Sequence, residues 1–307
     1  MVNNKGMDFK VVTWNTNKQG PSILEFLFGS SGRPDIVTLQ EVTDGQADAF
    51  RKTLADVGLP HAIYTGNRKA REKRYGNVIA SRWPVRSVNS DLYQQRFLWP
   101  QLLGHAAIDV GPGEIDVITA HIPNGWGNGW AKIDTFRVLA DLVREVKGPL
   151  VLTGDFNEPQ YRIQNDRIVT FGQAEKLPYE YWGQWSFEGR SGTGEEWDSA
   201  VRWFFERHDE HGLRNAYWAA CGSCKIAVTH RTRHGNPRWF DHVFLSDDLK
   251  VRSCRYVHTV RLKGLSDHSA FVVHLVVRDN TTLKPPSGAR TSKTKRAGIS
   301  RRSRLSV

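Results

Sequence analysis

The sequence predicts a mixed α/β fold in one large folded unit. Short runs of β-branched and aromatic residues between turn signals alternate with stretches of helical periodicity. The chain of 307 residues is 39% hydrophobic and 24% charged, which is typical of a globular protein with a substantial core. No apolar run approaches the ~18 residues of a membrane span, so we expect none.

The expected elements follow one another along the chain without a repeat or an internal linker. Strands are predicted at residues 9–15, 35–41, 77–85, 114–123, 149–157, 239–246 and 270–277. Helical periodicity covers residues 43–57, 131–146 and 199–207. The interval 160–197 is rich in Trp and Gly and has weak periodicity, so we expect long loops there.

The formal charge of +11 is concentrated at the C-terminal end. From Arg278 onward the chain carries nine basic residues and one acid, which leaves a net +3 for everything before it. This segment is rich in Pro, Ser and Thr and poor in apolar residues, a composition typical of disorder. We therefore expect a catalytic domain at 1–277 and a basic tail at 278–307. The tail is either a polyanion-binding arm or a solubilising segment.

The number of cysteines and the composition of the first ten residues bear on the cellular compartment. Three cysteines form no evident disulfide framework, and the first ten residues lack the apolar core of a signal peptide. We expect a cytoplasmic monomer. Cys221 and Cys224, followed by His230 and His234, imitate a zinc spacing, but the five residues between the pairs are too few for a finger, which needs about twelve.

Polar side chains follow several predicted strands where each strand ends. They are Asn15 and Asn17, Glu41, His121 and Asn124, Asp155 and Asn157, and later Asp241 with His242 and Asp267 with His268. Ligands of α/β sheets bind beyond the carboxyl ends of parallel strands, so these residues are expected to converge. Each alone is explained equally well as a turn residue or a helix cap. Together they predict a site.

The motifs W-N, L-Q-E, H-x-P-N, G-D-F-N, F-D-H and S-D-H occur in this order between residues 8 and 277. This order resembles the endonuclease/exonuclease/phosphatase superfamily, which includes exonuclease III and pancreatic-type deoxyribonuclease. The resemblance implies a four-layer α/β sandwich, in which two mixed β-sheets pack face to face with helices outside. It also implies a metal-dependent phosphoric ester hydrolase.

The resemblance assigns metal and phosphate ligands. Glu41 would be the principal ligand of Mg²⁺, with Asn17 and Asp267 near it, and Mn²⁺ is a possible substitute. Hard oxygen ligands suit Mg²⁺, which needs only one or two carboxylates from the protein. Asn15, Asn124 and Asn157 would hydrogen-bond phosphate oxygens without adding negative charge.

The remaining roles concern proton transfer. Asp155 would orient or deprotonate the attacking water, and His268, held by Asp241, would act as base or as charge stabiliser. The sequence leaves open which of Asp155 and His268 takes the proton. His121 is a candidate proton donor to the leaving group, because an imidazole has a reference pKa of about 6.5.

Two departures bear on the substrate. His121 stands where abasic-site endonucleases have Tyr, and Val42 and Thr43 stand where they usually have Thr-Lys, which favours a less specialised phosphodiesterase. The segment 67–77, with five basic residues, resembles loops that grip a nucleic-acid backbone. The tryptophans at 126, 130, 182 and 185 either stack on bases or pack in the fold.

Two function classes follow. The first is a Mg²⁺-dependent nuclease acting on nucleic acid, with DNA preferred. The second is a phosphoesterase acting on a phospholipid headgroup, an inositol phosphate or another phosphorylated metabolite. The basic loop and the basic tail favour the nuclease.

Overall fold

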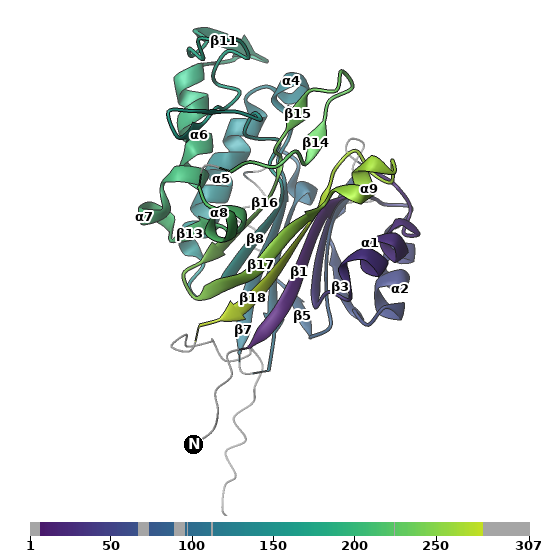
Figure 1. The fold of residues 1–307 in the computed structure, drawn as a ribbon. Coiled ribbons are helices and arrows are strands. Elements are labelled where there is room, and N and C mark those ends of the chain that lie inside the picture. The colour runs from purple at the N-terminus through teal and green to yellow at the C-terminus, as the bar shows by residue number, and fades with distance from the viewer. Residues whose placement is uncertain are drawn as a thin grey trace, which may run out of the picture.

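Two mixed six-stranded sheets form the centre of the molecule (Figure 1). The computed structural model describes residues 7–66, 74–88, 96, 98–111, 113–223 and 225–278. The strand order is β17-β18-β1-β2-β4-β3 in the first sheet and β13-β16-β8-β7-β6-β5 in the second. Helices cover the outer faces, which confirms the predicted four-layer α/β sandwich (Figure 1).

The first sheet is built around one parallel pair, β1 (Asp8–Asn15) and β2 (Ile36–Thr43). Its other neighbours run antiparallel: β3 (His61–Tyr64), β4 (Tyr75–Ser81), β17 (Leu249–Val257) and β18 (Ala270–Val277). The pairing of Asp8 with Val276 puts the end of β18 beside the start of β1. Val277, the last residue of β18, therefore lies at the end of the sheet opposite Asn15, about 25 Å away at the usual rise per residue.

The second sheet repeats this arrangement around the parallel pair β7 (Glu114–His121) and β8 (Leu150–Asp155). Antiparallel neighbours complete it: β5 (Val85–Ser87), β6 (Leu103–Asp109), β13 (Leu213–Asn215) and β16 (Asp241–Ser246). Three small hairpins lie outside the two sheets: β9 (Ile163–Gln164) with β10 (Arg167–Ile168), β11 (Gln184–Phe187) with β12 (Arg190–Thr193), and β14 (His230–Arg231) with β15 (Pro237–Arg238).

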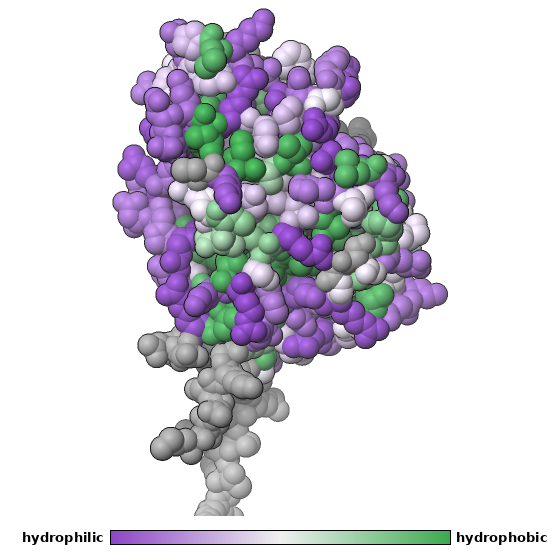
Figure 2. Space-filling model, viewed as in Figure 1, coloured by the Kyte–Doolittle hydropathy of each residue, from purple (hydrophilic) through white to green (hydrophobic). Residues whose placement is uncertain are grey.

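Long helices flank the sheets on opposite sides (Figure 1). The first sheet is covered by α1 (Ile23–Ser31) and α2 (Ala47–Asp56), and the second by α5 (Ala131–Glu145) and α6 (Gly194–Glu206). The other helices are short: η1 (Pro100–Leu102), α4 (Gly125–Asn128), α7 (His208–His211), α8 (Ala216–Cys221) and α9 (His258–Leu262). In the part of the chain that the structure describes, no helix has the length and apolar character to cross a membrane. Figure 2 shows hydrophobic side chains interspersed among hydrophilic ones on the face in view.

Strand β1 explains why the core has two parts. Phe9 and Val11 belong to the cluster that fills the space between the sheets and continues beneath α5 and α6, whereas Val12 and Trp14 pack in the cluster beneath α1 and α2. Alternate residues of a strand face opposite sides, so an apolar run is buried on both faces of this central strand.

Polar groups between the sheets bond to one another. Thr38 and Thr153 share a hydrogen bond of 2.9 Å, and Gln40 donates to Thr119 at 2.9 Å. Each pair joins one sheet to the other, so these bonds fix how the sheets are aligned.

Two predicted segments differ from the structure. The run 77–85 is not one strand, because β4 ends at Ser81 and β5, in the other sheet, begins only at Val85, after Pro84, which has no N–H for a sheet ladder. The interval 160–197 holds two hairpins and the start of α6, where Thr193 caps the helix by accepting from the N–H of Glu196. Residues 279–307 lie outside the described residues, so the boundary between domain and tail stays a prediction.

Candidate active site

The site forms where the two parallel strand pairs end. Asn15 closes β1, Glu41 lies near the end of β2, His121 closes β7 and Asp155 closes β8. The side-chain amide of Asn15 donates to Glu41 Oε1 at 3.3 Å and to Asp155 Oδ2 at 2.9 Å. His121 Nε2 lies between the same two carboxylates, 3.7 Å from Glu41 Oε1 and 3.8 Å from Asp155 Oδ2. Residues from both sheets thus meet at one point.

Glu41 occupies an unusual backbone position. Its φ is 57°, and the pairing of β2 with β4 shifts register between Leu39 and Val42. A left-handed conformation is costly for a residue other than Gly, and such outliers cluster at functional sites. The Glu41 carboxylate is partly exposed and is approached by the exposed ammonium of Lys18 at 3.4 Å. It is therefore an anchored carboxylate that solvent or a cation can reach.

The G-D-F-N segment turns sharply after β8. Asp155 Oδ1 accepts from the N–H of Asn157 at 2.9 Å, and the Asn157 side chain donates to the carbonyl of Ile122 at 2.9 Å. Gly154 has φ 137°, and a Cβ there would lie 1.9 Å from the carbonyl oxygen of Ala120, so only glycine fits. The turn thereby holds Asp155 at the end of its strand.

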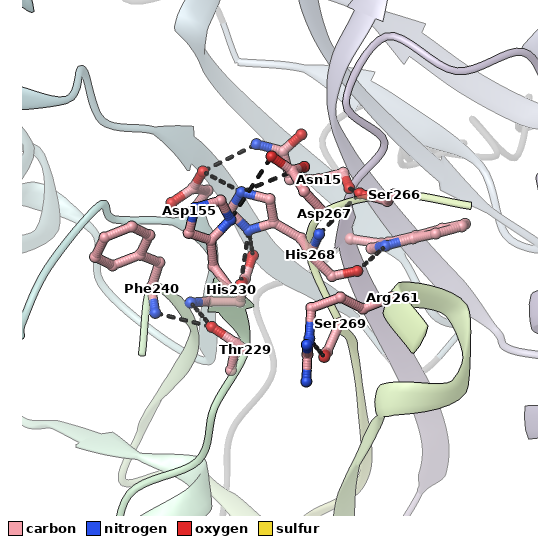
Figure 3. A network of polar contacts seen from close by, with 12 residues as sticks. Asn15, Asp155, Thr229, His230, Phe240, Arg261, Ser266, Asp267, His268 and Ser269 are labelled. Atoms are coloured by element: carbon pink, nitrogen blue, oxygen red, sulfur yellow. Dashed lines mark hydrogen bonds and ion pairs between the residues drawn. The ribbon is translucent and has the colours of Figure 1, made fainter. Parts of the chain in front are cut away.

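Asp241 and His268 form a buried pair beside Asp155. Figure 3 shows His268 next to Asp155. His268 Nδ1 lies 2.9 Å from Asp241 Oδ2, and its Nε2 lies 3.6 Å from Asp155 Oδ2. Asp241 faces Asp155 in the register of β16 and β8. The carbonyl of His268 accepts from the indole of Trp14 at 3.0 Å. The S-D-H motif is thus anchored to β1.

The electrostatics of this trio are strongly perturbed. Burial raises the pKa of Asp241 to about 6, although His268 opposes this. Burial alone would lower the pKa of His268, but Asp241 and Asp155 together raise it to about 10. Burial would also raise the pKa of Asp155, but His268 and His121 lower it below its usual range. At neutral pH the trio is an imidazolium between two carboxylates.

The other predicted residues lie around this centre. Asn17 donates its backbone N–H to Asn15 Oδ1 at 2.9 Å. Asn124 is exposed and caps α4 by accepting from the N–H of Gly127 at 3.0 Å. Asp267 is about half exposed, with Oδ2 at 3.7 Å from His230 Nδ1 and Oδ1 at 4.0 Å from His268 Nε2.

Sequence reasoning missed a buried ion pair beneath the G-D-F-N turn. Lys132 Nζ lies 3.1 Å from Glu158 Oε1, with both side chains at most 2% exposed, and donates to the carbonyl of Asn157 at 2.6 Å. Glu158 also accepts from the indole of Trp197 at 2.6 Å and from the N–H of Phe171 at 3.1 Å. The only signal in the sequence was an acid directly after the G-D-F-N motif.

His230 is a second missed neighbour of the site. It forms an isolated antiparallel bridge with His268, and the two ring centres are 4.6 Å apart. Burial and the nearby His268 lower the pKa of His230 to about 4. His242 of the F-D-H motif instead points into the core, with Nε2 2.8 Å from the carbonyl oxygen of Glu158.

Several other predictions fall away from the site or outside the described residues. Cys224 and residues 67–73 of the basic loop lie outside them, and His234 contacts Arg233 on the β14–β15 hairpin. Trp130, Trp182 and Trp185 pack together with Trp197. Trp126, by contrast, is 97% exposed on α4. Of these four predicted tryptophans, Trp126 offers the free ring face.

Comparison with known proteins identifies the family. The model of the Endonuclease/Exonuclease/phosphatase family matches residues 12–268. The chain belongs to this family, as the order of its motifs predicted. A comparison with curated proteins gives no match.

Solved structures share the fold. The 3′ phosphatase NExo from Neisseria, bound to a product DNA hairpin, is 20% identical with a TM-score of 0.61, covering 86% of this chain and 98% of its own. An AP endonuclease from Archaeoglobus fulgidus is 19% identical with a TM-score of 0.60, at the same coverages of 86% and 98%. TDP2 from D. rerio, complexed with a single-strand DNA product, is 11% identical with a TM-score of 0.58, covering 87% and 98%.

Proposed function

We propose that the protein is a Mg²⁺-dependent phosphodiesterase that hydrolyses phosphodiester bonds of nucleic acid, with DNA as its substrate. The observation that carries the proposal is the meeting of Glu41, His121 and Asp155 at the ends of strands from both sheets. Carboxylates, imidazoles and amides placed within hydrogen-bonding reach of one point are what phosphate ester hydrolysis requires.

The donor set fits a hard cation. Glu41 is a partly exposed carboxylate at the mouth of the site, and oxygen ligands of this kind suit Mg²⁺ and also Mn²⁺. Glu41 would hold the ion, with Asn17 and Asp267 as the partners that the family resemblance implies. When bound, the ion neutralises charge on the phosphate.

The pKa values support a division of labour between Asp155 and His268. Asp155, whose pKa is lowered, is ionised at neutral pH and would orient the attacking water and accept its proton. His268, whose pKa is raised to about 10, stays protonated and would balance the charge of the phosphate oxygens. Asp241 would keep the imidazolium in place, and His121 would give a proton to the leaving oxygen.

Three observations support nucleic acid as the substrate. The segment from Arg278 onward has a net charge of +8, out of +11 for the whole chain, and the 67–77 loop has five basic residues. Trp126 exposes its ring on α4, five residues after His121, the last residue of β7. The structures of NExo and TDP2 contain DNA products. We also propose that the protein acts as a monomer and in the cytoplasm, since its three cysteines form no evident disulfide framework.

The test is an assay of the purified full-length protein with Mg²⁺. Supercoiled plasmid, abasic duplex, RNA, phospholipid and inositol phosphate are offered in parallel, and we expect cleavage of DNA that a chelator abolishes. Turnover of only the lipid or the inositol phosphate would instead establish the alternative phosphoesterase.

The metal assignment is tested by Glu41→Gln, which keeps the shape of the side chain and removes its charge. We expect turnover to fall by at least about 10²-fold with an unchanged circular dichroism spectrum. Glu25→Gln, on the exposed face of α1, is the matched control and should retain the wild-type rate. Full Mg²⁺-dependent turnover in Glu41→Gln would refute the assignment.

A further inference from the structure

Three side chains beside the site form a cluster to which the proposed reaction gives no common role. His230, Asp267 and His268 each offer one ligand atom, and these atoms lie within 4.8 Å of one another. Figure 3 shows the two imidazoles and the carboxylate gathered at one place. The bridge between His230 and His268 fixes the backbones that carry them.

His230 presents a nitrogen that lacks a partner. Its Nδ1 is buried and makes no hydrogen bond of good geometry, although Asp267 Oδ2 is 3.7 Å away. Its ring is stacked on Phe240, with centroids 5.4 Å apart and planes inclined by 18°, so rotation of the ring is restricted. A buried ring nitrogen without a partner costs free energy, which points to a bound group that satisfies it.

The spacing suits a metal ion. Ligand atoms about 2.1 Å from a tetrahedral ion are about 3.4 Å apart. His230 Nδ1 lies 3.7 Å from Asp267 Oδ2, and His268 Nε2 lies 4.0 Å from the other oxygen, Oδ1. With one ligand atom taken from each residue, all three lie within 4.8 Å of one another, so small side-chain rotations would bring them onto one ion. Two imidazole nitrogens and one carboxylate oxygen suit Zn²⁺, Co²⁺ or Ni²⁺, whereas Mg²⁺ prefers oxygen.

We propose that His230, Asp267 and His268 bind a divalent ion of the zinc class, and that this ion inhibits the enzyme. The ion takes His268 Nε2 and displaces its proton to solvent, while Nδ1 stays bonded to Asp241, as in the carboxylate–histidine–zinc arrangement. His268 Nε2 is then occupied by the ion and can no longer face the phosphate. This inhibitory part rests on the proposed function, whereas metal binding does not.

Binding is measured with Co²⁺ alone, by calorimetry and by its visible absorption. The proteins are untagged, carry Ser at the three cysteines so that no thiolate competes, and carry Glu41→Gln to remove the Mg²⁺ ligand. We expect one Co²⁺ per chain, with an affinity at least about tenfold lower in His230→Phe, which keeps the aromatic ring on Phe240. His234→Phe, on the exposed turn of the same hairpin, is the control and should bind as the parent does.

Inhibition is measured with Glu41 intact, as the Zn²⁺ concentration that halves each variant's own Mg²⁺-dependent rate. We expect that concentration to rise at least about tenfold in His230→Phe and to stay unchanged in His234→Phe. Equal Co²⁺ affinity in folded His230→Phe and its parent overturns the site. Loss of Co²⁺ binding with undiminished inhibition by Zn²⁺ overturns the inhibitory role. Absence of turnover on every phosphate ester refutes the proposed function, while the Co²⁺ titration still decides the site.

Discussion

The buried ion pair beneath the G-D-F-N turn gives a sharp prediction for Lys132→Met. Lys132 and Glu158 are almost completely buried and 3.1 Å apart, so removing the ammonium leaves a buried carboxylate with only Trp197 and Phe171 as donors. Breaking a buried pair in this way costs about 3–5 kcal/mol of folding stability. We expect a loss of this size in urea unfolding.

The same substitution should lower catalysis in the protein that remains folded. Lys132 donates to the carbonyl of Asn157, whose backbone N–H in turn holds Asp155. A displacement of about 1 Å in such a group costs about 10²-fold in rate. We therefore expect kcat to fall by about that factor at a temperature where the variant is folded. Lys147→Met, at an exposed position after α5, should change neither quantity.

A double-mutant cycle separates the pair from its surroundings. Glu158→Gln alone should also lower the folding stability. The double variant, Lys132→Met with Glu158→Gln, leaves no buried charge unpaired. Its loss of stability should therefore be at least about 1.5 kcal/mol smaller than the sum of the two single losses. Additive losses, or a loss below about 1 kcal/mol for Lys132→Met, would refute the reasoning.

Three further predictions concern the pair of His268 and Asp241, the stability of the fold in acid, and the basic tail. His268→Ala and Asp241→Ala should each lower turnover by about 10²–10⁴-fold and the double variant little further; additive losses would separate the two residues. Burial lowers the pKa of His242 to about 4, from 6.5 in the unfolded chain, so the unfolded chain takes up the proton first as the pH falls. About 3 kcal/mol of folding stability that is present above pH 6.5 is therefore lost by pH 4. In urea unfolding, the free energy of unfolding of His242→Gln should lack that part of the pH dependence. The same dependence on pH as in the wild type would contradict the prediction. Deleting residues 278–307 should preserve turnover at saturating substrate. It should also flatten the slope of log affinity for DNA against log salt concentration by about 0.9 per lost phosphate contact, whereas equal slopes would leave the tail a solubilising segment.

The central strands were predictable because their residues are β-branched and apolar on both faces, as in Ile36–Thr43. Other elements lacked such a signal. Ile23–Ser31 begins with a short apolar run that periodicity cannot assign to a helix or a strand. Leu249–Val257 is an edge strand with exposed Lys and Arg, which protect an edge but hide its β pattern.

The residues of the site likewise include some that the sequence predicted and some that it did not. Asn15, Glu41, His121 and Asp155 were found because each ends a recognisable strand, and the structure brings all four together. Their proposed roles remain predictions. Lys132 could not be found in this way, because one lysine in an amphipathic helix is usually on its solvent face, and only tertiary packing brings it to Glu158.

The division of the site between two sheets makes its geometry depend on how the sheets pack. Asn15 and Glu41 come from the first sheet, His121 and Asp155 from the second, and the Asn15 amide joins the two carboxylates. The buried bonds of Thr38 with Thr153 and of Gln40 with Thr119 lie between the same strand pairs. A slip of one sheet on the other would break those bonds and separate Glu41 from Asp155. The polar residues in an otherwise apolar interface therefore set the distance between the two carboxylates of the candidate site, which apolar contacts alone, being non-directional, would not fix.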